Sequence, residues 1–455
     1  MVTVAEIVAH QHQYFLSDAT KPLAFRIAAL KKLHSGIVEH ESRILAALKA
    51  DLNKSDFEGY MTEIGMVLAE LRFALKHIKK WVRPQQVPTP LMHWPAKSFI
   101  LPEPYGVALI MSPWNYPFQL CIAPLIGAIA AGNCAVLKPS EHAPHTSRAI
   151  AELIAACFPP EFVAVVEGGP EQYTALLNQK FDYIFFTGGA AVGRVVMEAA
   201  ARNLTPVSLE LGGKSPCIID QSADLKMAAR RVAFGKFLNA GQTCVAPDYL
   251  LVHKQVRDRF IELFSAALEE FFPDQDYDDL PVIINDRHFS RLMGLLEDEN
   301  ILLGGRSHAE SRFIEPTLVG EVALHSPLMQ EEIMGPILPL LCFEDLDEVI
   351  AIVRSMPRPL ALYLFSSDQD AQQRVHNSLS FGGGCINDTI IHLSTPHLGF
   401  GGVGDSGMGR YHGKFSFDTF THYKSILKKS AWLDLPVRYH PYTDGKFKLL
   451  RRFLR

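Results

Sequence analysis

The stretch YIFFTGGAAVGRVVMEAAA, residues 183–201, decides the fold. An apolar strand is expected over Tyr183–Phe186, which runs into Gly188 and Gly193 and then into a helix over Arg194–Ala201. A strand, a glycine-containing turn and a helix in this order are typical of a dinucleotide-binding domain, whose turn lies against a pyrophosphate. An alanine stands at the middle glycine of the fingerprint, so this motif alone is weak evidence.

Short apolar strands alternate with helical stretches on both sides of this segment. They are separated by roughly 20–30 residues, the period of βα units in a parallel sheet. The first set is GVALIMS, CAVLKPS, VAVVEG, YIFFTG and VSLELGG, and the second is CIID, DYLLVH, FIEPTLVG, ILPLLCF, ALYLFS and GGGCIND. The two sets predict an α/β protein with a Rossmann-like, doubly wound cofactor domain and a second α/β catalytic domain.

The ends of the chain differ from this pattern. Apolar residues recur at helical spacing from Val4 to about Trp81, and six prolines follow within residues 84–104, where the chain must be extended. A final strand is expected over Phe415–Leu427. We therefore expect a cofactor domain over residues 1–212, from which the arm 83–104 departs, a catalytic domain over 213–412, and an oligomerisation strand and tail over 413–455. The arm and this strand would form a small β oligomerisation element.

Composition excludes several classes of protein. The chain has 455 residues, of which 48% are hydrophobic, so it can bury large cores. Its net charge of −5 provides no general positive field, and we expect no nucleic-acid partner. Seven scattered cysteines without a CxxC pair favour free thiols in a reducing cytoplasm. No secretory signal or membrane span is expected, because proline and glycine interrupt the longest apolar stretch.

Cys244 is the candidate nucleophile. The segment GQTCVAPDYLLVH places it in a loop between a helix expected over Leu225–Leu238 and a strand. Free cysteines are usually core residues, but Asn239, Gly241 and Pro247 give this loop a turn-forming composition. Such a loop would expose one sulfur on a rigid scaffold.

Two polar residues follow other predicted strands. Glu210 ends the strand in VSLELGGKSP, at the sheet edge where cofactor crevices open, and a raised pKa there would suit a general base. A surface glutamate in an ordinary loop is an equal alternative. Asn115 follows the strand Val107–Met111 and could stabilise an oxyanion together with the Cys244 N–H. Asparagine in a turn more often bonds its own backbone, and only the combination of residues argues otherwise.

The ribose-binding residue is not where a Rossmann fingerprint usually has it. About 20 residues after the fingerprint only Glu210 is available. Lys138 and Glu141 in CAVLKPSEH lie just past another strand end and are better candidates. Glu141 would favour NAD through the ribose hydroxyl, whereas Lys138 would tolerate the phosphate of NADP, so both cofactors are expected.

Seven ordered motifs make the chain resemble the aldehyde dehydrogenase superfamily, specifically the class 3 type that includes fatty and aromatic aldehyde dehydrogenases. The motifs are PWNYPF, VLKPSE, FTGGAAVG, LELGGKSP, GQTCVAPDY, EEIMGP and FGGVGDSGMGRYHGKFSFDTF. The resemblance implies oxidation of medium- or long-chain aliphatic or aromatic aldehydes to carboxylic acids with NAD or NADP, by a homodimer. It implies Cys244 as the nucleophile that forms the thioester, Glu210 as the base that activates water, and Asn115 as the oxyanion donor.

The resemblance also implies a cofactor site. In it, Lys138 and Glu141 would contact the adenosine ribose, Gly188 and Gly193 would border the pyrophosphate, and Glu332 would bind the nicotinamide ribose.

Two residues depart from the family pattern. Met334 stands in EEIMGP where the family usually has phenylalanine, and its flexible thioether would hold the nicotinamide end less rigidly. Gly189 replaces a polar residue near the pyrophosphate, which leaves more of that contact to backbone N–H groups. Neither departure removes a catalytic group.

Three other functions use some of the same residues. A cysteine esterase or thiohydrolase needs Cys244 and Glu210 but not the cofactor motifs. A CoA-acylating dehydrogenase would not need Glu210. A catalytically silent structural protein would not need the nucleophile, the base and the amide, all of which are present.

Two other sequence features, the histidines near the carboxyl end and the basic tail, do not require a further function. The histidines do not show the spacing of a metal-binding motif, so no metal is expected; they occur at positions 392, 397, 412 and 422. The tail KFKLLRRFLR places Phe447, Leu450 and Leu454 on one helical face flanked by basic residues. We expect this face to pack on the protein itself or on a dimer partner, with peripheral membrane contact as the alternative.

Overall fold

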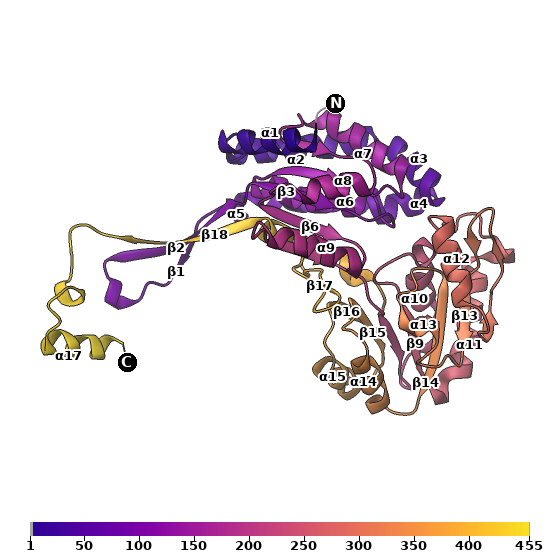
Figure 1. Ribbon diagram of the computed structural model, residues 1–455. Coiled ribbons are helices and arrows are strands. Elements are labelled where there is room, and N and C mark those ends of the chain that lie inside the picture. Colours follow the sequence, from indigo (N-terminus) through magenta and orange to yellow (C-terminus); the bar gives the residue numbers. More distant parts are fainter. Residues whose placement is uncertain (1–2, 455) are drawn as a thin grey trace.

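Buried strands and the helices between them build two α/β units, and a narrow arm leaves the first of them (Figure 1). The computed structural model describes residues 3–454. The first unit carries the amino-terminal helices, and the second carries most of the chain after residue 215. This architecture confirms the predicted fold class of two α/β units and a small β arm.

The first sheet has the strand order β17-β7-β6-β3-β4-β5. Its neighbours pair in parallel except β17, which pairs antiparallel with β7. The order reverses between β3 and β6, and in open α/β sheets ligands bind at the carboxyl ends of the strands at such a point. The strands are β3 (Val107–Met111), β4 (Cys134–Lys138), β5 (Val163–Val165), β6 (Tyr183–Thr187), β7 (Val207–Glu210) and β17 (Gly407–Met408).

Helices cover both faces of this sheet. The connecting helices are α6 (Gln119–Ala131), α7 (Pro144–Cys157), α8 (Pro170–Leu177) and α9 (Ala190–Ala201). All thirteen residues of α6 are buried, as expected for a helix that is apolar on every side. Helix α9 begins directly after Gly189, four residues earlier than the predicted start at Arg194.

The amino-terminal segment is helical, as predicted. Its elements are α1 (Val4–Leu16), α2 (Leu23–Glu39), α3 (Glu41–Leu52), α4 (Asp56–Gly59), the π-helical η1 (Tyr60–Ile64) and α5 (Gly65–Trp81). Helix α1 packs beside β3 and β4, while α2 contacts α5, α6 and α7.

The second sheet has the order β10-β13-β14-β9-β8-β15-β16 and is parallel except for β10. Its strands are β8 (Pro216–Ile219), β9 (Tyr249–His253), β10 (Ile301–Leu303), β13 (Thr317–Gly320), β14 (Ile337–Phe343), β15 (Ala361–Phe365) and β16 (Gly383–Ile386). Its helices are α10 (Leu225–Phe237), α11 (Arg257–Phe271), α12 (Asp286–Leu295), α13 (Pro327–Gln330), α14 (Leu346–Ser355) and α15 (Gln369–Ser378). A separate ribbon joins β11 (Ser307–His308) to β12 (Phe313–Ile314).

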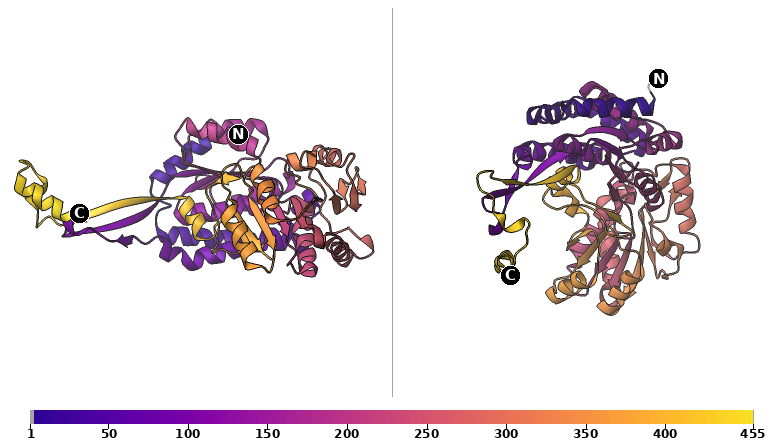
Figure 2. Two further views of the ribbon diagram at one scale, coloured as in Figure 1. Left: turned by 90° about the horizontal axis from the view of Figure 1, so that it is seen from below. Right: turned by 60° about the vertical axis from the view of Figure 1, so that its left-hand side comes forward.

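The arm is a three-stranded antiparallel sheet of β1 (Gln85–Val87), β2 (Ala96–Pro104) and β18 (Thr421–Lys429). It projects far from the body in Figure 1 and in the left view of Figure 2. Its outer end carries exposed aromatic rings, with Trp94 55% and Trp432 71% exposed. Large apolar surfaces left open in a single chain commonly mark an interface.

The predicted strand over Phe415–Leu427 is partly wrong. Residues Lys414–Thr419 form helix α16, and β18 starts only at Thr421. The segment is helical because Phe417 and Phe420, three residues apart, both enter the core, where Phe417 packs 5.6 Å from the Trp81 ring.

The tail forms helix α17 (Asp444–Phe453). Leu449 and Leu450 line an apolar groove together with residues of the arm, and Phe447, Leu449 and Leu454 are exposed in the single chain. Packing of this helix on a dimer partner therefore stays a prediction. Among residues 3–454, no helix combines the length and the apolar character that crossing a bilayer requires.

Glu70 on α5 accepts a hydrogen bond of 2.6 Å from the Gly413 N–H, and this bond ties the amino-terminal helices to the carboxyl-terminal part of the chain. Gly413 has φ +56°, and a Cβ there would lie 2.0 Å from the Pro396 carbonyl oxygen, so the position requires glycine. Burial raises the pKa of Glu70 from 4.5 to about 7.

We predict that Glu70→Gln flattens the pH dependence of stability. Because the pKa is higher in the folded state, the folded protein binds the proton more tightly, and the free energy of unfolding falls as pH rises from 4.5 to about 7. This loss is on the order of 3 kcal/mol. Glutamine keeps an acceptor for Gly413 but does not ionise. Thermal unfolding of both proteins at pH 5 and pH 8 tests this, and equal pH dependence of the two melting temperatures would contradict it.

Candidate active site

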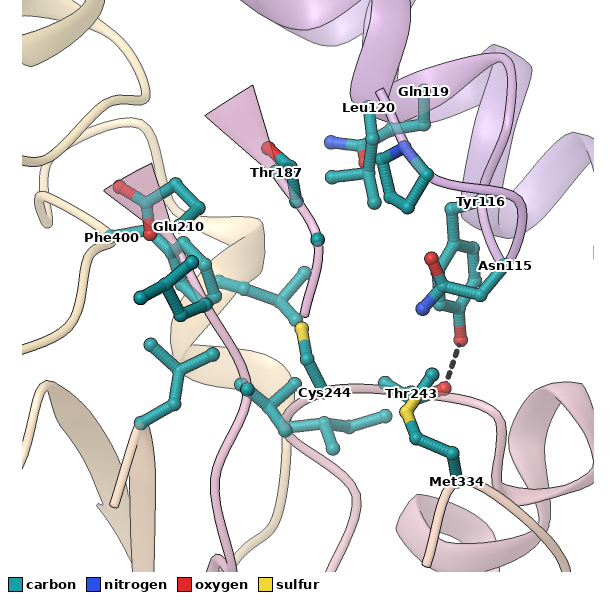
Figure 3. Close-up of a pocket in the computed structure, with 18 of the residues that line it drawn as sticks. Asn115, Tyr116, Gln119, Leu120, Thr187, Glu210, Thr243, Cys244, Met334 and Phe400 are labelled. Carbon is teal, nitrogen blue, oxygen red and sulfur yellow. Dashed lines mark hydrogen bonds between the residues drawn. The ribbon is translucent and has the colours of Figure 1, made fainter. Parts of the chain in front are cut away.

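A cavity of about 820 Å³ opens where the carboxyl edge of the first sheet faces the second unit. The residues after β3, at the end of β6 and at the end of β7 line one side, and the loop before β9 lines the other. Three predicted catalytic residues, Asn115, Glu210 and Cys244, lie in this cavity (Figure 3). The structure therefore brings together three groups that are distributed over residues 115–244 of the chain.

Cys244 lies in a loop whose backbone is strained. Asn239 and Ala240 have φ of 55° and 51°, and Gly241 has φ +72°. A Cβ on Gly241 would meet the Gly335 carbonyl oxygen at 2.2 Å, so this position requires glycine. The side chain of Cys244 points into the cavity between Glu210 and Asn115 (Figure 3). Non-glycine residues in the left-handed region cost free energy and concentrate at functional sites.

The thiol of Cys244 is difficult to ionise in this environment. Its burial, together with the nearby carboxyl groups of Glu332 and Glu210, raises its pKa to about 12. A thiolate is the reactive form of cysteine, so the isolated site holds its nucleophile in the unreactive form.

Asn115 is buried in the turn after β3, at 3% exposure. Its Nδ2 donates a hydrogen bond of 2.9 Å to the carbonyl of Gln242, two residues before the cysteine. A primary amide has two N–H donors, so the second is left for another acceptor in the cavity. The bond to Gln242 aims this side chain at the space in front of Cys244.

Glu210 ends β7 with only 2% exposure. Neither of its carboxylate oxygens has a hydrogen-bond partner among the residues that the structure describes. Burial raises its pKa well above the usual 4.5. An unpartnered carboxyl group with a raised pKa is suited to proton transfer.

Glu332 lines the same cavity and has one buried oxygen, Oε1, without a partner in the described part of the chain. Burial, followed by the charge of Asp248, raises its pKa to about 8. A Cβ on Gly212 would lie 1.9 Å from Glu332 Oε2, so glycine allows this carboxyl group to lie close against the main chain. The neighbouring Met334 lines the cavity with a positive φ of 51°.

The turn from Thr187 to Ala191 also lines the cavity. Gly189 is the N-cap of α9 and provides no side-chain cap, so the first N–H groups of the helix are free to bind an anion. A Cβ on Gly189 would meet open space, whereas one on Gly188 would lie 2.6 Å from the Phe186 ring. These features fit a dinucleotide, with its pyrophosphate at this turn and a ribose hydroxyl at the unpartnered oxygen of Glu332.

Three predicted cofactor residues are not part of the cavity lining: Lys138, Glu141 and Gly193. The Lys138 ammonium is fully buried, donates to the Pro139 carbonyl at 2.7 Å and lies 4.1 Å from the Tyr173 ring centroid. Glu141 has a partly exposed side chain, and its Oε2 lies 3.9 Å from the Lys138 Nζ. A Cβ on Gly193 would lie 2.7 Å from Leu211, which indicates a packing role.

Four further residues shape the site. The hydroxyl groups of Tyr116 and Thr243 share a hydrogen bond of 2.6 Å that joins the two catalytic loops (Figure 3). Both lie inside motifs quoted above, which could have identified them. Lys54 and Glu63 form a buried ion pair behind Asn115, and no local sequence signal marks them.

The histidines do not form a metal centre. Between residues 3 and 454, no three histidine, cysteine, aspartate or glutamate side chains cluster closely enough to hold a metal ion. Burial lowers the pKa of both His392 and His412 to about 4, which keeps these rings neutral.

Comparison with known proteins gives one consistent family. Residues 2–426 match the sequence profile of the aldehyde dehydrogenase family. The chain is 52% identical over 446 residues to 4,4'-diaponeurosporen-aldehyde dehydrogenase of Staphylococcus aureus, covering 97% of each protein. It is 44% identical to aldehyde dehydrogenase family 3 member A2 of Macaca fascicularis, covering 98% of this chain and 94% of the relative.

Two further comparisons agree. The chain is 42% identical to the dimeric NADP-preferring aldehyde dehydrogenase of Canis lupus familiaris, covering 97% of this chain and 98% of the relative. A solved structure of the substrate-bound state of Staphylococcus aureus AldH matches with a TM-score of 0.98 and 50% identity, covering 100% of both chains.

We predict that Cys244 reacts slowly with iodoacetamide in the cofactor-free protein at pH 7. Because its pKa is about 12, the alkylation rate should rise about tenfold per pH unit up to pH 9.5 without a plateau. Mass spectrometry of the peptide that contains residue 244 measures this rate. A rate that stops rising tenfold per pH unit near pH 9, the ordinary pKa of a thiol, would show that Cys244 ionises normally.

Proposed function

Because this chain belongs to the aldehyde dehydrogenase family, we propose that it oxidises medium- or long-chain aliphatic or aromatic aldehydes to carboxylic acids through a thioester on Cys244. As a member of the family it is an NAD(P)-dependent oxidoreductase. The detailed proposal depends on one observation. A thiol, an unpartnered carboxyl group and an amide donor lie together in one cavity.

In the proposed reaction, the Cys244 thiol loses its proton to solvent, and the resulting thiolate attacks the aldehyde carbon. The resulting oxyanion accepts hydrogen bonds from the free N–H of the Asn115 amide and from the Cys244 backbone N–H. The bound nicotinamide supplies the hydride acceptor for this step. Cys244 then carries the acyl group as a thioester.

Glu210 acts in the second half of the reaction. Its carboxylate takes a proton from a water molecule, the water oxygen attacks the thioester carbon, and the carbon–sulfur bond breaks to release the acid. The absence of any hydrogen bond to Glu210 among the described residues supports this role, since both oxygens remain free to accept the proton.

Apolar side chains around the reacting groups support the proposed substrate class. The cavity wall includes Met61, Met66, Leu120, Ile391 and Phe400. Such a wall favours an aldehyde with a long or aromatic apolar portion, because burial of each methylene group contributes about 0.8 kcal/mol. The named aldehyde of the Staphylococcus aureus relative, 4,4'-diaponeurosporen-aldehyde, is a further substrate to test.

The cofactor is NAD or NADP. We propose that Gly188 borders the pyrophosphate, that Glu332 binds the nicotinamide ribose, and that Glu141 with Lys138 contacts the adenosine ribose. The Lys138 ammonium donates one of its three N–H groups to the Pro139 carbonyl, which leaves donors for a ribose hydroxyl or a phosphate, so both cofactors are to be tested. The NADP preference named for the dog relative makes the direct comparison necessary.

We also propose that the protein is a cytoplasmic homodimer. The projecting arm with its exposed aromatic end supports a partner, and one relative is named as dimeric. The seven free cysteines support a reducing compartment. We propose that each part of the chain has a separate role. The cofactor domain consists of residues 1–212 without the arm 83–104, and the catalytic domain, residues 213–412, contains the nucleophile. The arm and residues 413–455 together form the oligomerisation element.

The first test is the formation of reduced cofactor with acetaldehyde, hexanal, decanal and benzaldehyde, using NAD and NADP. We expect kcat/KM to rise about fourfold per methylene until the cavity is filled, and Cys244→Ser to abolish the signal. Equal efficiency with acetaldehyde and decanal would contradict the substrate class. Hydrolysis of an ester without any cofactor-dependent oxidation would instead favour the esterase.

The second test separates acylation from hydrolysis. In Glu210→Gln we expect a burst of about one reduced cofactor per site followed by turnover reduced roughly 10²–10⁴-fold. Because burial raises the pKa of Glu210, wild-type turnover should increase as pH rises through this pKa, and the variant should lose that increase. Glu70→Gln, which alters another buried glutamate outside the cavity, is the control. Normal turnover in folded Glu210→Gln would rule out Glu210 as the base.

A further inference from the structure

A buried ion pair lies behind the turn that carries Asn115. The Lys54 Nζ is 2.6 Å from Glu63 Oε1, and both side chains are fully buried. Lys54 precedes α4, and Glu63 lies in the π-helical segment η1. Buried charges are costly unless other bonds compensate them, and π-helical turns often occur at functional sites.

The remaining bonds of this pair go to the turn. Lys54 Nζ donates to the carbonyl of Asn115 at 3.0 Å. Glu63 Oε2 accepts hydrogen bonds of 2.9 Å from the N–H groups of both Phe118 and Gln119, where α6 begins. A carboxylate is favoured at the start of a helix, because it satisfies free N–H groups and interacts with the helix dipole. The pair thus holds the turn at both of its ends.

The nucleophile loop is attached to the same point. Asn239 Nδ2 donates to the Asn115 carbonyl at 2.8 Å, so this oxygen accepts one bond from Lys54 and one from the loop. The Asn239 N–H in turn donates to Glu58 Oε1 at 2.9 Å. Loss of Lys54 would remove one of the two hydrogen bonds that orient the Asn115 peptide. The Asn115 side chain would then no longer be held in one direction.

We propose that Lys54 and Glu63 are positioning residues that keep the Asn115 amide aimed at the oxyanion. The proposal rests on the proposed function, in which Asn115 donates to that oxyanion. Neither Lys54 nor Glu63 is among the residues that line the cavity, so both act through the turn and not on the substrate.

Arg26 provides a matched control. It is also a buried cation bonded to backbone carbonyls, donating to Thr20 at 3.2 Å and to Ala130 at 3.3 Å. Ala130 lies at the far end of α6 from the Asn115 turn. Arg26→Met therefore removes a comparable charge without touching that turn.

The experiment measures the burst rate of reduced cofactor in Lys54→Met. We expect the burst to slow by about tenfold to a hundredfold, the loss produced by a small misplacement of a catalytic group, while the aldehyde KM stays nearly constant. Arg26→Met should lower the melting temperature but keep the wild-type burst. The same slowing in Arg26→Met would overturn the proposal, because it would reveal a general effect of lost stability.

A double-mutant cycle decides whether Lys54 acts through Asn115. If it does, Lys54→Met combined with Asn115→Ala should have a burst rate within about a factor of two of Asn115→Ala alone. If the two substitutions slow the burst by factors that multiply in the double variant, Lys54 acts independently of Asn115, and the proposal is overturned.

The paired variant Lys54→Met with Glu63→Gln is measured in parallel, because it leaves no single buried charge and should fold even where Lys54→Met does not. A wild-type burst in either folded variant would overturn the positioning role. That failure is distinct from failure of the proposed function, which would appear as a wild-type burst in Asn115→Ala itself.

Discussion

The hydrogen bond from the Asn115 side chain to the Gln242 carbonyl joins the two α/β units at the point where the chemistry takes place. Asn115 follows a strand of the first sheet, and Gln242 belongs to the loop before a strand of the second. Two further hydrogen bonds, from Asn239 to the Asn115 carbonyl and between Tyr116 and Thr243, join the same two segments, so the amide donor and the Cys244 sulfur are held together. Glu210, at the end of β7, completes the site only because the cysteine loop is held against the first sheet.

Removal of water determines the chemistry of the site. The pKa values of Cys244, Glu210 and Glu332 are all raised, with burial as the largest cause. Burial therefore disfavours the charged form of all three groups, and an environment that disfavours charge suits an apolar molecule. The unpartnered oxygens of Glu210 and Glu332 cost stability in the folded state, a cost that proteins commonly carry at functional sites.

Much of this arrangement follows from local sequence pattern. The strand Val107–Met111 was predicted to the residue, because a fully buried parallel strand is a continuous apolar run bounded by turns. Asn115 and Glu210 could be predicted to converge, because the carboxyl ends of parallel strands meet at one edge. Cys244 precedes a strand of the second sheet, so its place beside them was implied only by the family resemblance. Helix α16 was mistaken for a strand, since its aromatic spacing fits both structures until the core beneath it is known.

The ion pair behind Asn115 could not be predicted from the sequence. The partners of its two residues lie in a turn more than fifty residues further along the chain, and no local pattern connects the two segments. Sequence pattern also could not distinguish a glycine that borders a ligand from one that packs: Gly188 lines the cavity, whereas Gly193 lies against Leu211. Lys424 on β18 bonds Glu103 on β2 across 321 positions. One edge of β2 therefore stays unpaired during translation until residues 421–429 have been synthesised, and unpaired edges of this kind can pair with other chains.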